Sequence, residues 1–274
     1  MICIKTVIPA ELNEIETTAE FNQVLQALDD PEVDFIFVSG VAGTGKSTLI
    51  SIARRMPEKN VVVVAPTGIA AMNIGGTTIH STFRLPFGPA PEPAVQYGPR
   101  AAILTRMDLL IIDEISMVKA DILDAISKSL KSHRRNNRPF GGVKVAVFGD
   151  LFQLAPVVED EEQPVLTALG YESNFFFEAR CFGEVRTKVF QLTRTFRHED
   201  PVFARVLSNI RTGRNIIESL GFINQNCLTQ EGLDNVALTL TTRTANAEDR
   251  NHQKLNMLWP RNTTKRIKKK TKKK

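Results

Sequence analysis

The chain of 274 residues has no apolar run that approaches the ~20 residues needed by a membrane-spanning helix. Its first residues, MICIKTVIPAELNE, lack the basic start and apolar core of a signal peptide. Only three cysteines are present, and Cys3, Cys181 and Cys227 show neither a C-x-x-C spacing nor the density of a disulfide framework. These absences argue against membrane, secreted and zinc-binding classes. We therefore expect a soluble intracellular protein with isolated thiols.

The net charge is unevenly distributed along the chain. The whole chain carries +5, but residues 261–274 hold nine lysines and arginines and no acid. The preceding 260 residues are therefore mildly acidic, with a net charge of −4. A basic segment of this kind either binds nucleic-acid backbones or remains a solvated tail. The overall charge alone is thus weak evidence for a nucleic-acid partner.

Short apolar runs alternate with amphipathic stretches over the first 150 residues. In residues 21–28, for example, apolar side chains recur every three or four positions, which indicates one face of a helix. Four runs without polar alternation are typical of strands buried on both faces: Phe35–Ser39, Val61–Ala65, Leu109–Asp113 and Val143–Phe148. This order predicts an α/β fold with a mostly parallel, doubly wound sheet, whose ligand lies at the carboxyl ends of the strands.

The first of these strands is followed by a phosphate-binding pattern. Gly40–Ser47 reads GVAGTGKS and fits G-x-x-x-x-G-K-S/T between a predicted strand and a predicted helix. Glycines let backbone N–H groups turn toward phosphates, and the helix N-terminus adds partial positive charge. Lys46 would neutralise the β- and γ-phosphates, and the Ser47 hydroxyl would bind Mg²⁺. The predicted nucleotide-binding residues are Gly40, Ala42, Gly43, Thr44, Gly45, Lys46, Ser47 and Thr48.

A second apolar run, Leu109–Glu114 (LLIIDE), ends in two carboxylates. We expect the strand to hold Asp113 where it reaches Mg²⁺, usually through water. Glu114, one residue on, would orient and deprotonate the attacking water. Because a kinase would more often lack the adjacent glutamate, the pair favours hydrolysis over phosphate transfer to a small molecule. The chain is therefore predicted to be a P-loop nucleoside-triphosphatase.

Five further segments carry more specific patterns. They are Ala65–Ala71 (APTGIAA), Gly76–Phe83 (GTTIHSTF), Asp113–Met117 (DEISM), Gly149–Pro156 (GDLFQLAP) and Leu192–His198 (LTRTFRH). In this order they resemble the motifs of the PIF (petite integration frequency) helicases of superfamily one and, more distantly, those of RecD-type helicases. The resemblance runs from about residue 10 to about residue 255.

The resemblance implies an ATP hydrolase that uses ATP and Mg²⁺ to move 5′ to 3′ on single-stranded DNA and to unwind duplex or structured DNA. Such helicases serve genome maintenance, including DNA repair, DNA recombination and telomere maintenance. The implied domains are a first RecA-like ATPase domain with its N-terminal segment over residues 1–190, the incomplete start of a second RecA-like domain over 191–260, and a lysine-rich tail over 261–274.

The resemblance also implies roles for single residues. Gln153 would sense the γ-phosphate, and Arg197 would be the arginine that the second domain presents to it, with Arg194 as the competing candidate. Gln23 is the nearest match to an adenine-recognising glutamine, although an exposed helix glutamine is the alternative interpretation. Phe83 is either a base-stacking platform or a core residue. The residues implied to form the DNA surface are Pro66, Thr67, Gly68, Thr78, His80 and Ser81.

The resemblance stops near Asn256, where the basic tail begins to replace the late motifs of the family. We therefore expect a C-terminally truncated monomer in which nucleotide binding is intact, hydrolysis is slow and processive unwinding is absent. The alternative is an ATP-regulated, DNA-binding P-loop module that does not unwind DNA. The expected location is the cytoplasm of a bacterium, or the nucleus or mitochondria of a eukaryote.

Overall fold

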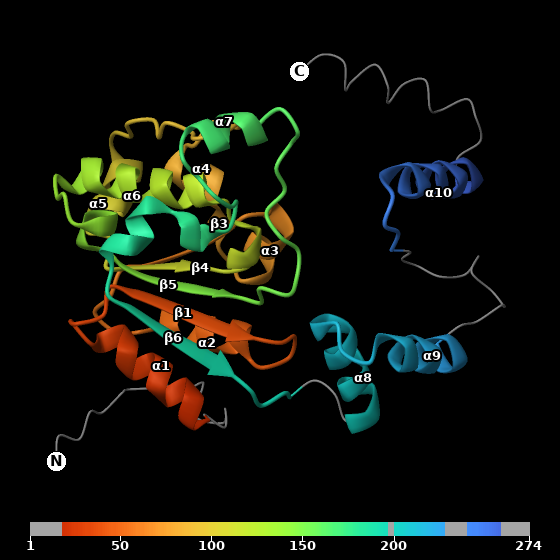
Figure 1. The fold of residues 1–274 in the computed structure, drawn as a ribbon. Helices are drawn as coiled ribbons and strands as arrows, with labels where there is room; N and C mark the ends of the chain where they lie inside the picture. Colours follow the sequence, from red (N-terminus) through yellow and green to blue (C-terminus); the bar gives the residue numbers. More distant parts are fainter. Residues whose placement is uncertain (1–17, 197–199, 228–239, 259–274) are drawn as a thin grey trace. The chain divides into compact units, whose positions relative to one another are not determined.

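The computed structural model describes residues 18–196, 200–227 and 240–258, and its central feature is one parallel sheet (Figure 1). Over the described residues the sheet has six strands in the order β3-β2-β4-β5-β1-β6. The strands are β1 (Phe35–Gly40), β2 (Val61–Ala65), β3 (Thr77–Thr78), β4 (Leu109–Ile112), β5 (Lys144–Gly149) and β6 (Thr187–Leu192). Every neighbouring pair is parallel, which confirms the predicted doubly wound α/β architecture.

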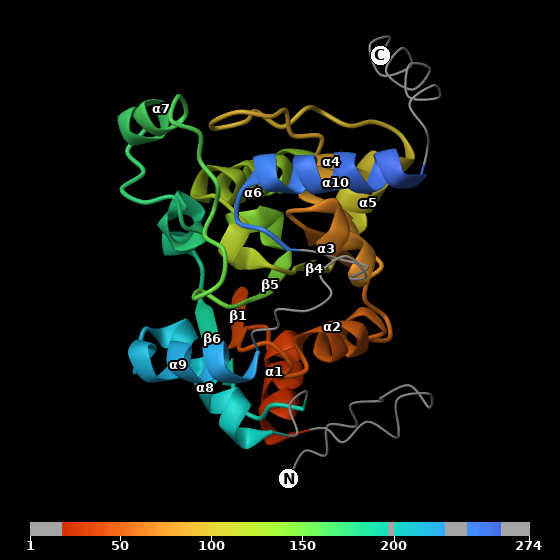
Figure 2. The same cartoon turned by 90° about the vertical axis from the view of Figure 1, so that its right-hand side faces the viewer.

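Helices cover both faces of the sheet, and successive strand residues point to opposite layers. On β1, Phe35 and Phe37 pack with the layer of α4 (Ile79–Phe83), α5 (Pro99–Arg106) and α6 (Ala120–Arg134). Ile36 and Val38 pack with the layer of α1 (Ala19–Asp29) and α2 (Lys46–Arg54). Figure 2, turned by 90°, shows the two layers on either side of the strands. Burial on both faces explains why these strands read as continuous apolar runs.

The predicted apolar face of α1 is confirmed. Its buried residues include Phe21, Val24, Leu25 and Leu28. The helix begins where the Thr18 side chain accepts a hydrogen bond from the Phe21 N–H at 3.2 Å, an N-cap that satisfies one of the free donors of the first turn. This cap and the buried stripe hold α1 against the sheet beside the end of β1.

Shorter elements occupy the connections. Of these, α3 (Gly68–Asn73) follows β2, the 3-10 helix η2 (Ile115–Met117) follows β4, and the 3-10 helix η3 (Pro139–Gly142) precedes β5. Between β5 and β6 lie α7 (Gln163–Ala168), η4 (Phe176–Glu178) and η5 (Arg180–Glu184), and α8 (Pro201–Thr212) follows β6. Residues 84–98 connect α4 to α5 without forming a helix or a strand.

Contacts divide the chain into two compact units, Met1–Ile216 and Ile217–Lys274. In the second unit, α9 (Ile216–Asn226) and α10 (Thr244–Leu258) are the described helices. A boundary after residue 190 would cut through β6, all six residues of which pair with β1. The domain limits of 1–190, 191–260 and 261–274 remain predictions.

Among the described helices, none is long and apolar enough to cross a membrane. Cys181 is buried and Cys227 is exposed, and both are free thiols, whereas Cys3 lies outside the described residues.

Candidate active site

The loop between β1 and α2 is tightly folded around its glycines. Gly45 has φ +85°, and a Cβ atom there would lie 2.6 Å from Cζ of Phe21. Only glycine suits this left-handed, crowded position. The Lys46 ammonium, at the first residue of α2, donates hydrogen bonds to the carbonyl oxygens of Gly40 at 2.6 Å and Val41 at 3.0 Å. The lysine is thereby held over the loop at the carboxyl end of β1.

Asp113 and Glu114 lie at the carboxyl end of β4, two strands from β1 across the sheet. The Asp113 N–H donates to the Val64 carbonyl at 2.9 Å, which continues the pairing with β2 beyond the last residue of β4. The Asp113 residue is only 8% exposed. Burial, together with repulsion from Glu114, raises the Asp113 pKa to about 6, although Lys46 opposes the rise. A buried carboxylate whose charge is disfavoured by its surroundings is suited to bind a cation, which would stabilise that charge.

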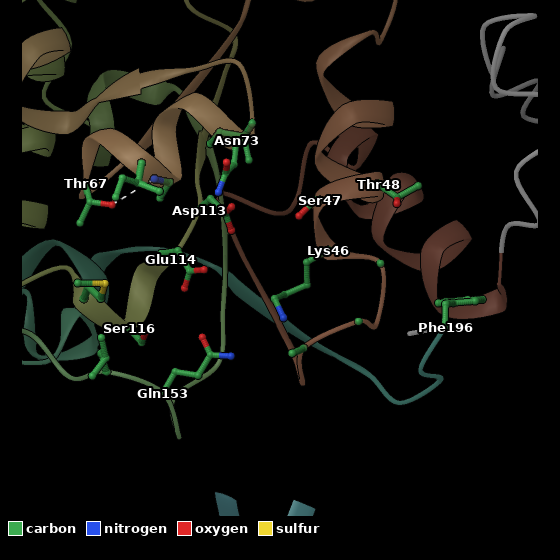
Figure 3. A pocket seen from close by; sticks show the side chains of 18 of the residues that line it. Lys46, Ser47, Thr48, Thr67, Asn73, Asp113, Glu114, Ser116, Gln153 and Phe196 are labelled. Carbon is green, nitrogen blue, oxygen red and sulfur yellow. Dashed lines mark hydrogen bonds between the residues drawn. The ribbon is translucent and has the colours of Figure 1, made fainter. Parts of the chain in front are cut away.

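Glu114 has a left-handed backbone, with φ +52°. Such a conformation costs a non-glycine residue about 1–3 kcal/mol and is often found where side-chain position matters for function. Figure 3 shows the Glu114 carboxylate beside the Lys46 and Gln153 side chains, which point toward the same space. The strained turn therefore brings a carboxylate into the cavity that the lysine faces.

These groups line one cavity of about 1090 Å³ at the carboxyl edge of the sheet. Burial lowers the Lys46 pKa, and the carboxylates of Asp150, Glu114 and Asp113 partly restore it. From the predicted sets, the lining residues are Ala42, Gly43, Gly45, Lys46, Ser47, Thr48, Thr67, Asp113, Glu114 and Gln153. The cavity thus combines one cation, two carboxylates, hydroxyls and the amides of Asn73 and Gln153.

Three predicted nucleotide-binding residues do not line this cavity. Gly40 ends β1, and Thr44 is buried beneath the loop, where its hydroxyl donates to the Val41 carbonyl at 2.9 Å. These two residues support the fold of the loop and do not face the cavity. Gln23 lies exposed on α1, outside the cavity lining, and its assignment to adenine remains a prediction. Arg197 lies outside the described residues.

Two aromatic residues of the cavity escaped the sequence interpretation. Phe21 and Phe196 both line it, with ring centroids 6.5 Å apart in an edge-to-face arrangement. The Phe196 N–H also donates to the Gly43 carbonyl at 2.8 Å, which ties the segment after β6 to the phosphate loop. Phe21 had been interpreted only as part of an apolar helix face. The one available signal for Phe196 was its place in LTRTFRH beside the predicted arginine.

The residues predicted to bind DNA follow β2 and β3, which are neighbours in the sheet. The Thr67 hydroxyl accepts a hydrogen bond from the Ala70 N–H, and the Thr78 hydroxyl accepts one from the Ser81 N–H, each at 3.2 Å. Both threonines therefore act as N-caps, of α3 and α4. The set is completed by Pro66, Gly68 and His80. Because β2 and β3 are parallel neighbours, their carboxyl ends place the set at the same edge of the sheet as the cavity.

Within this segment, half-buried His80 pairs with an exposed aromatic ring. The His80 ring stacks on Phe87, with centroids 5.1 Å apart and planes 21° apart. Phe87 is 91% exposed. Burial lowers the His80 pKa, and nearby Lys119 lowers it further, which favours the neutral imidazole. Phe83 is fully buried in the core, and of its two sequence interpretations the structure supports the core residue.

The residues of the cavity fit a magnesium ion that is bound together with phosphates. Over the described part of the chain, no group of three or more His, Cys, Asp or Glu side chains forms a self-contained metal site. Mg²⁺ is usually held by one or two protein oxygens, with phosphate and water completing its shell. Ser47 and Asp113, which line the same cavity, provide such a pair.

Comparison with known proteins identifies relatives of this chain. The family model described as PIF1-like helicase matches residues 12–221. The chain is 34% identical over 251 residues to the ATP-dependent DNA helicase PIF1 of Danio rerio, covering 89% of this chain and 37% of that protein. It is 30% identical over 221 residues to the ATP-dependent DNA helicase RRM3 of Saccharomyces cerevisiae, covering 76% of this chain and 30% of that protein.

Solved structures of similar proteins share the fold. The Pif1 helicase from Bacteroides in complex with ADP-AlF3 and single-stranded DNA matches with a TM-score of 0.82 and 37% identity, over 90% of this chain and 59% of that one. The Pif1 helicase from Candida albicans matches with a TM-score of 0.71 and 30% identity, over 89% and 55% of the two chains. The sheet is therefore that of a RecA-like domain. The chain spans about a third of the length of the two helicases above and less than two thirds of the two solved chains.

Proposed function

This chain belongs to the PIF1-like helicase family, and we propose that it is an ATP-hydrolysing DNA translocase that moves 5′ to 3′ on single-stranded DNA and separates duplex or structured DNA. The observation that carries the proposal is the convergence of Lys46, Asp113, Glu114 and Gln153 on one cavity. The proposed setting is genome maintenance by a monomer, in the bacterial cytoplasm or in the nucleus or mitochondria of a eukaryote.

In the proposed site, the loop before α2 holds the phosphates of ATP. The backbone around Gly43 and Gly45 supplies N–H donors, and the Lys46 ammonium can exchange its present carbonyl partners for phosphate oxygens. Ser47 and Asp113 would hold Mg²⁺, which supplies charge neutralisation at the phosphates when bound. The raised Asp113 pKa supports this role, because a bound cation favours the ionised carboxylate.

Hydrolysis is assigned to Glu114 and Gln153. Glu114 would accept a proton from the attacking water, which its strained backbone turn helps to position. Gln153 lies on the loop after β5, and its backbone N–H donates to the Asp150 carbonyl at 3.0 Å. From there its side-chain amide would hydrogen-bond the terminal phosphate. Arg197 is proposed to add positive charge at that phosphate, as arginine fingers do in other nucleotide hydrolases.

We assign the nucleotide base to the exposed ring of Phe196, which packs edge-to-face against the buried Phe21 ring. Both rings border the phosphate loop and line the cavity, whereas Gln23 does not. An aromatic face binds any purine by stacking, and a single ring contributes roughly 1–3 kcal/mol to such an interaction. The adenine would then be bound mainly by apolar contact, with Gln23 as a lesser, edge-binding candidate.

Single-stranded DNA is proposed to cross the edge formed by the ends of β2 and β3. The N-capped turns at Thr67 and Thr78 offer hydroxyl and backbone groups that suit sequence-independent phosphate contact. The exposed Phe87 ring, stacked on His80, offers a surface for a base. Thr67 also lines the nucleotide cavity, so α3 contacts both proposed ligands.

The test is ATP hydrolysis with and without an oligothymidylate, with Lys46→Ala beside wild type. Lys128→Ala is the matched control, because Lys128 is an exposed lysine on α6. We expect DNA to stimulate hydrolysis in the wild type and in the control, and Lys46→Ala to abolish it. Hydrolysis that is indifferent to DNA would refute the translocase. Tight DNA binding controlled by ATP without strand displacement from tailed duplexes would favour the alternative, an ATP-regulated DNA-binding module.

A further inference from the structure

A buried ion pair joins the end of β5 to the last turn of α8. Asp150 is 1% exposed. Its carboxylate accepts two hydrogen bonds from the Arg211 guanidinium, from Nε at 2.7 Å and from Nη2 at 2.6 Å. Two parallel charge-assisted bonds fix the relative orientation of the partners as well as their separation. Burial would raise the Asp150 pKa, but the bonds from Arg211 hold it below its usual value, so the pair is ionised at neutral pH.

The same aspartate organises the loop that carries Gln153. Its carboxylate accepts a hydrogen bond from the Phe152 N–H at 3.1 Å, and its backbone carbonyl accepts one from the Gln153 N–H at 3.0 Å. The Arg211 guanidinium also lies over the Phe152 ring, 4.5 Å from its centroid. Arg211 therefore contacts both the Asp150 carboxylate and the Phe152 ring of this loop.

The helix that carries Arg211 continues from a segment tied to the phosphate loop. Phe196 lines the nucleotide cavity and donates to the Gly43 carbonyl, and α8 begins at Pro201. Phe196 thus lies beside the nucleotide loop, and Arg211, on the helix that begins at Pro201, lies beside the Gln153 loop. A buried pair is a costly way to stabilise a fold, because both charges lose water.

We infer that Arg211 is a positioning residue for hydrolysis, which acts through Asp150 to hold Gln153 at the nucleotide cavity. The inference rests on the proposed function and adds to it a connection between α8 and the cavity. Lysine cannot replace the guanidinium fork, because its single ammonium cannot make the two parallel bonds. A displaced loop would leave nucleotide binding by Lys46 and the loop glycines intact and would slow the chemical step.

The experiment compares Arg211→Lys with wild type in the full chain. Arg205→Lys, an exposed arginine on the same helix, is the matched control. We expect Arg211→Lys to lower kcat for ATP about tenfold or more, since small misplacements of catalytic groups cost up to ~10²-fold, with little change in KM or in the thermal midpoint. A kcat equal to that of wild type, or a loss that follows only the unfolded fraction, would overturn the inference.

A double-mutant cycle with Gln153→Ala tests whether Arg211 acts through that residue. If it does, Arg211→Lys lowers kcat less than about twofold in the Gln153→Ala background; independent, multiplying effects would refute the assignment. Should Arg211→Lys not fold, Asp150→Asn combined with Arg211→Gln removes both charges and takes its place in the cycle. A wild-type chain without Lys46-dependent hydrolysis would refute the proposed function itself, whereas intact hydrolysis with independent effects would refute only the role of Arg211.

Discussion

Replacing Asp113 with asparagine is expected to stabilise the folded chain at neutral pH in the absence of nucleotide and Mg²⁺. Burial and the neighbouring Glu114 raise the Asp113 pKa from 3.8 to about 6. A carboxyl with a raised pKa binds its proton more readily in the folded state, so its contribution to stability is present below the ordinary pKa and is lost as pH rises through the folded-state value. At ~1.4 kcal/mol per pH unit, the loss reaches at most about 3 kcal/mol.

Because asparagine is neutral at every pH, the advantage of the variant should grow from near zero at about pH 4 to about 3 kcal/mol above pH 6. Urea unfolding followed by circular dichroism, with EDTA present, measures the free energy of unfolding at each pH. Glu172→Gln, which removes an exposed carboxylate, is the control and should match wild type. Equal stability of wild type and Asp113→Asn at pH 7, or parallel pH profiles, would show that Asp113 is not a strained, buried carboxyl.

Three further changes test other parts of the molecule. Phe196→Ala is expected to raise the KM for ATP about tenfold, with a smaller change in kcat, because a stacking surface for the base is lost; steady-state kinetics with an unchanged KM would argue against that role. Phe87→Ala is expected to weaken binding of a fluorescent oligothymidylate about tenfold. Phe177 is another exposed aromatic residue, and Phe177→Ala should leave this binding unchanged. Equal effects of the two substitutions would show that Phe87 is not part of the DNA surface. Asp34 accepts a bond from the Arg186 side chain at 2.8 Å, which holds the Asp34 pKa below its usual value. Asp34→Asn should therefore cost about 1 kcal/mol at pH 7, and the difference should close as pH falls below about 4; a difference that persists in acid would point to another cause.

Much of the fold was predictable because the central strands are buried on both faces. Burial of this kind leaves an apolar run that needs no knowledge of neighbours, as at Val61–Ala65 and Leu109–Ile112. The two edge strands, β3 and β6, gave no such signal. β6 has exposed residues, among them Val189, and only Leu192 is buried, while β3 has two residues. The pairing of β6 with β1 joins residues about 150 positions apart, which a local pattern cannot indicate.

The residues of the candidate site also fall into a group that the sequence predicted and a group that it did not. Lys46, Ser47 and the two carboxylates were predictable because each follows a buried strand at a fixed spacing, and parallel strands end at one edge. Phe21 and Phe196 were not, because their approach depends on how α1 and the segment after β6 meet at the phosphate loop. The pairing of Asp150 with Arg211 spans 61 residues and leaves no trace in either local sequence. Chemistry fixed by spacing was predictable, whereas side-chain partners brought together by packing were not.

We propose that Glu114 acts in hydrolysis, in a cavity that binds ATP independently of this residue. The most direct measurement compares phosphate release at saturating Mg-ATP and single-stranded DNA for wild type and Glu114→Gln, with ATP affinity measured on the same samples. We expect Glu114→Gln to bind ATP within about threefold of wild type and to release phosphate at least ~10²-fold more slowly, which is the contribution expected of a general base. Phosphate release at the wild-type rate by Glu114→Gln would contradict this proposal.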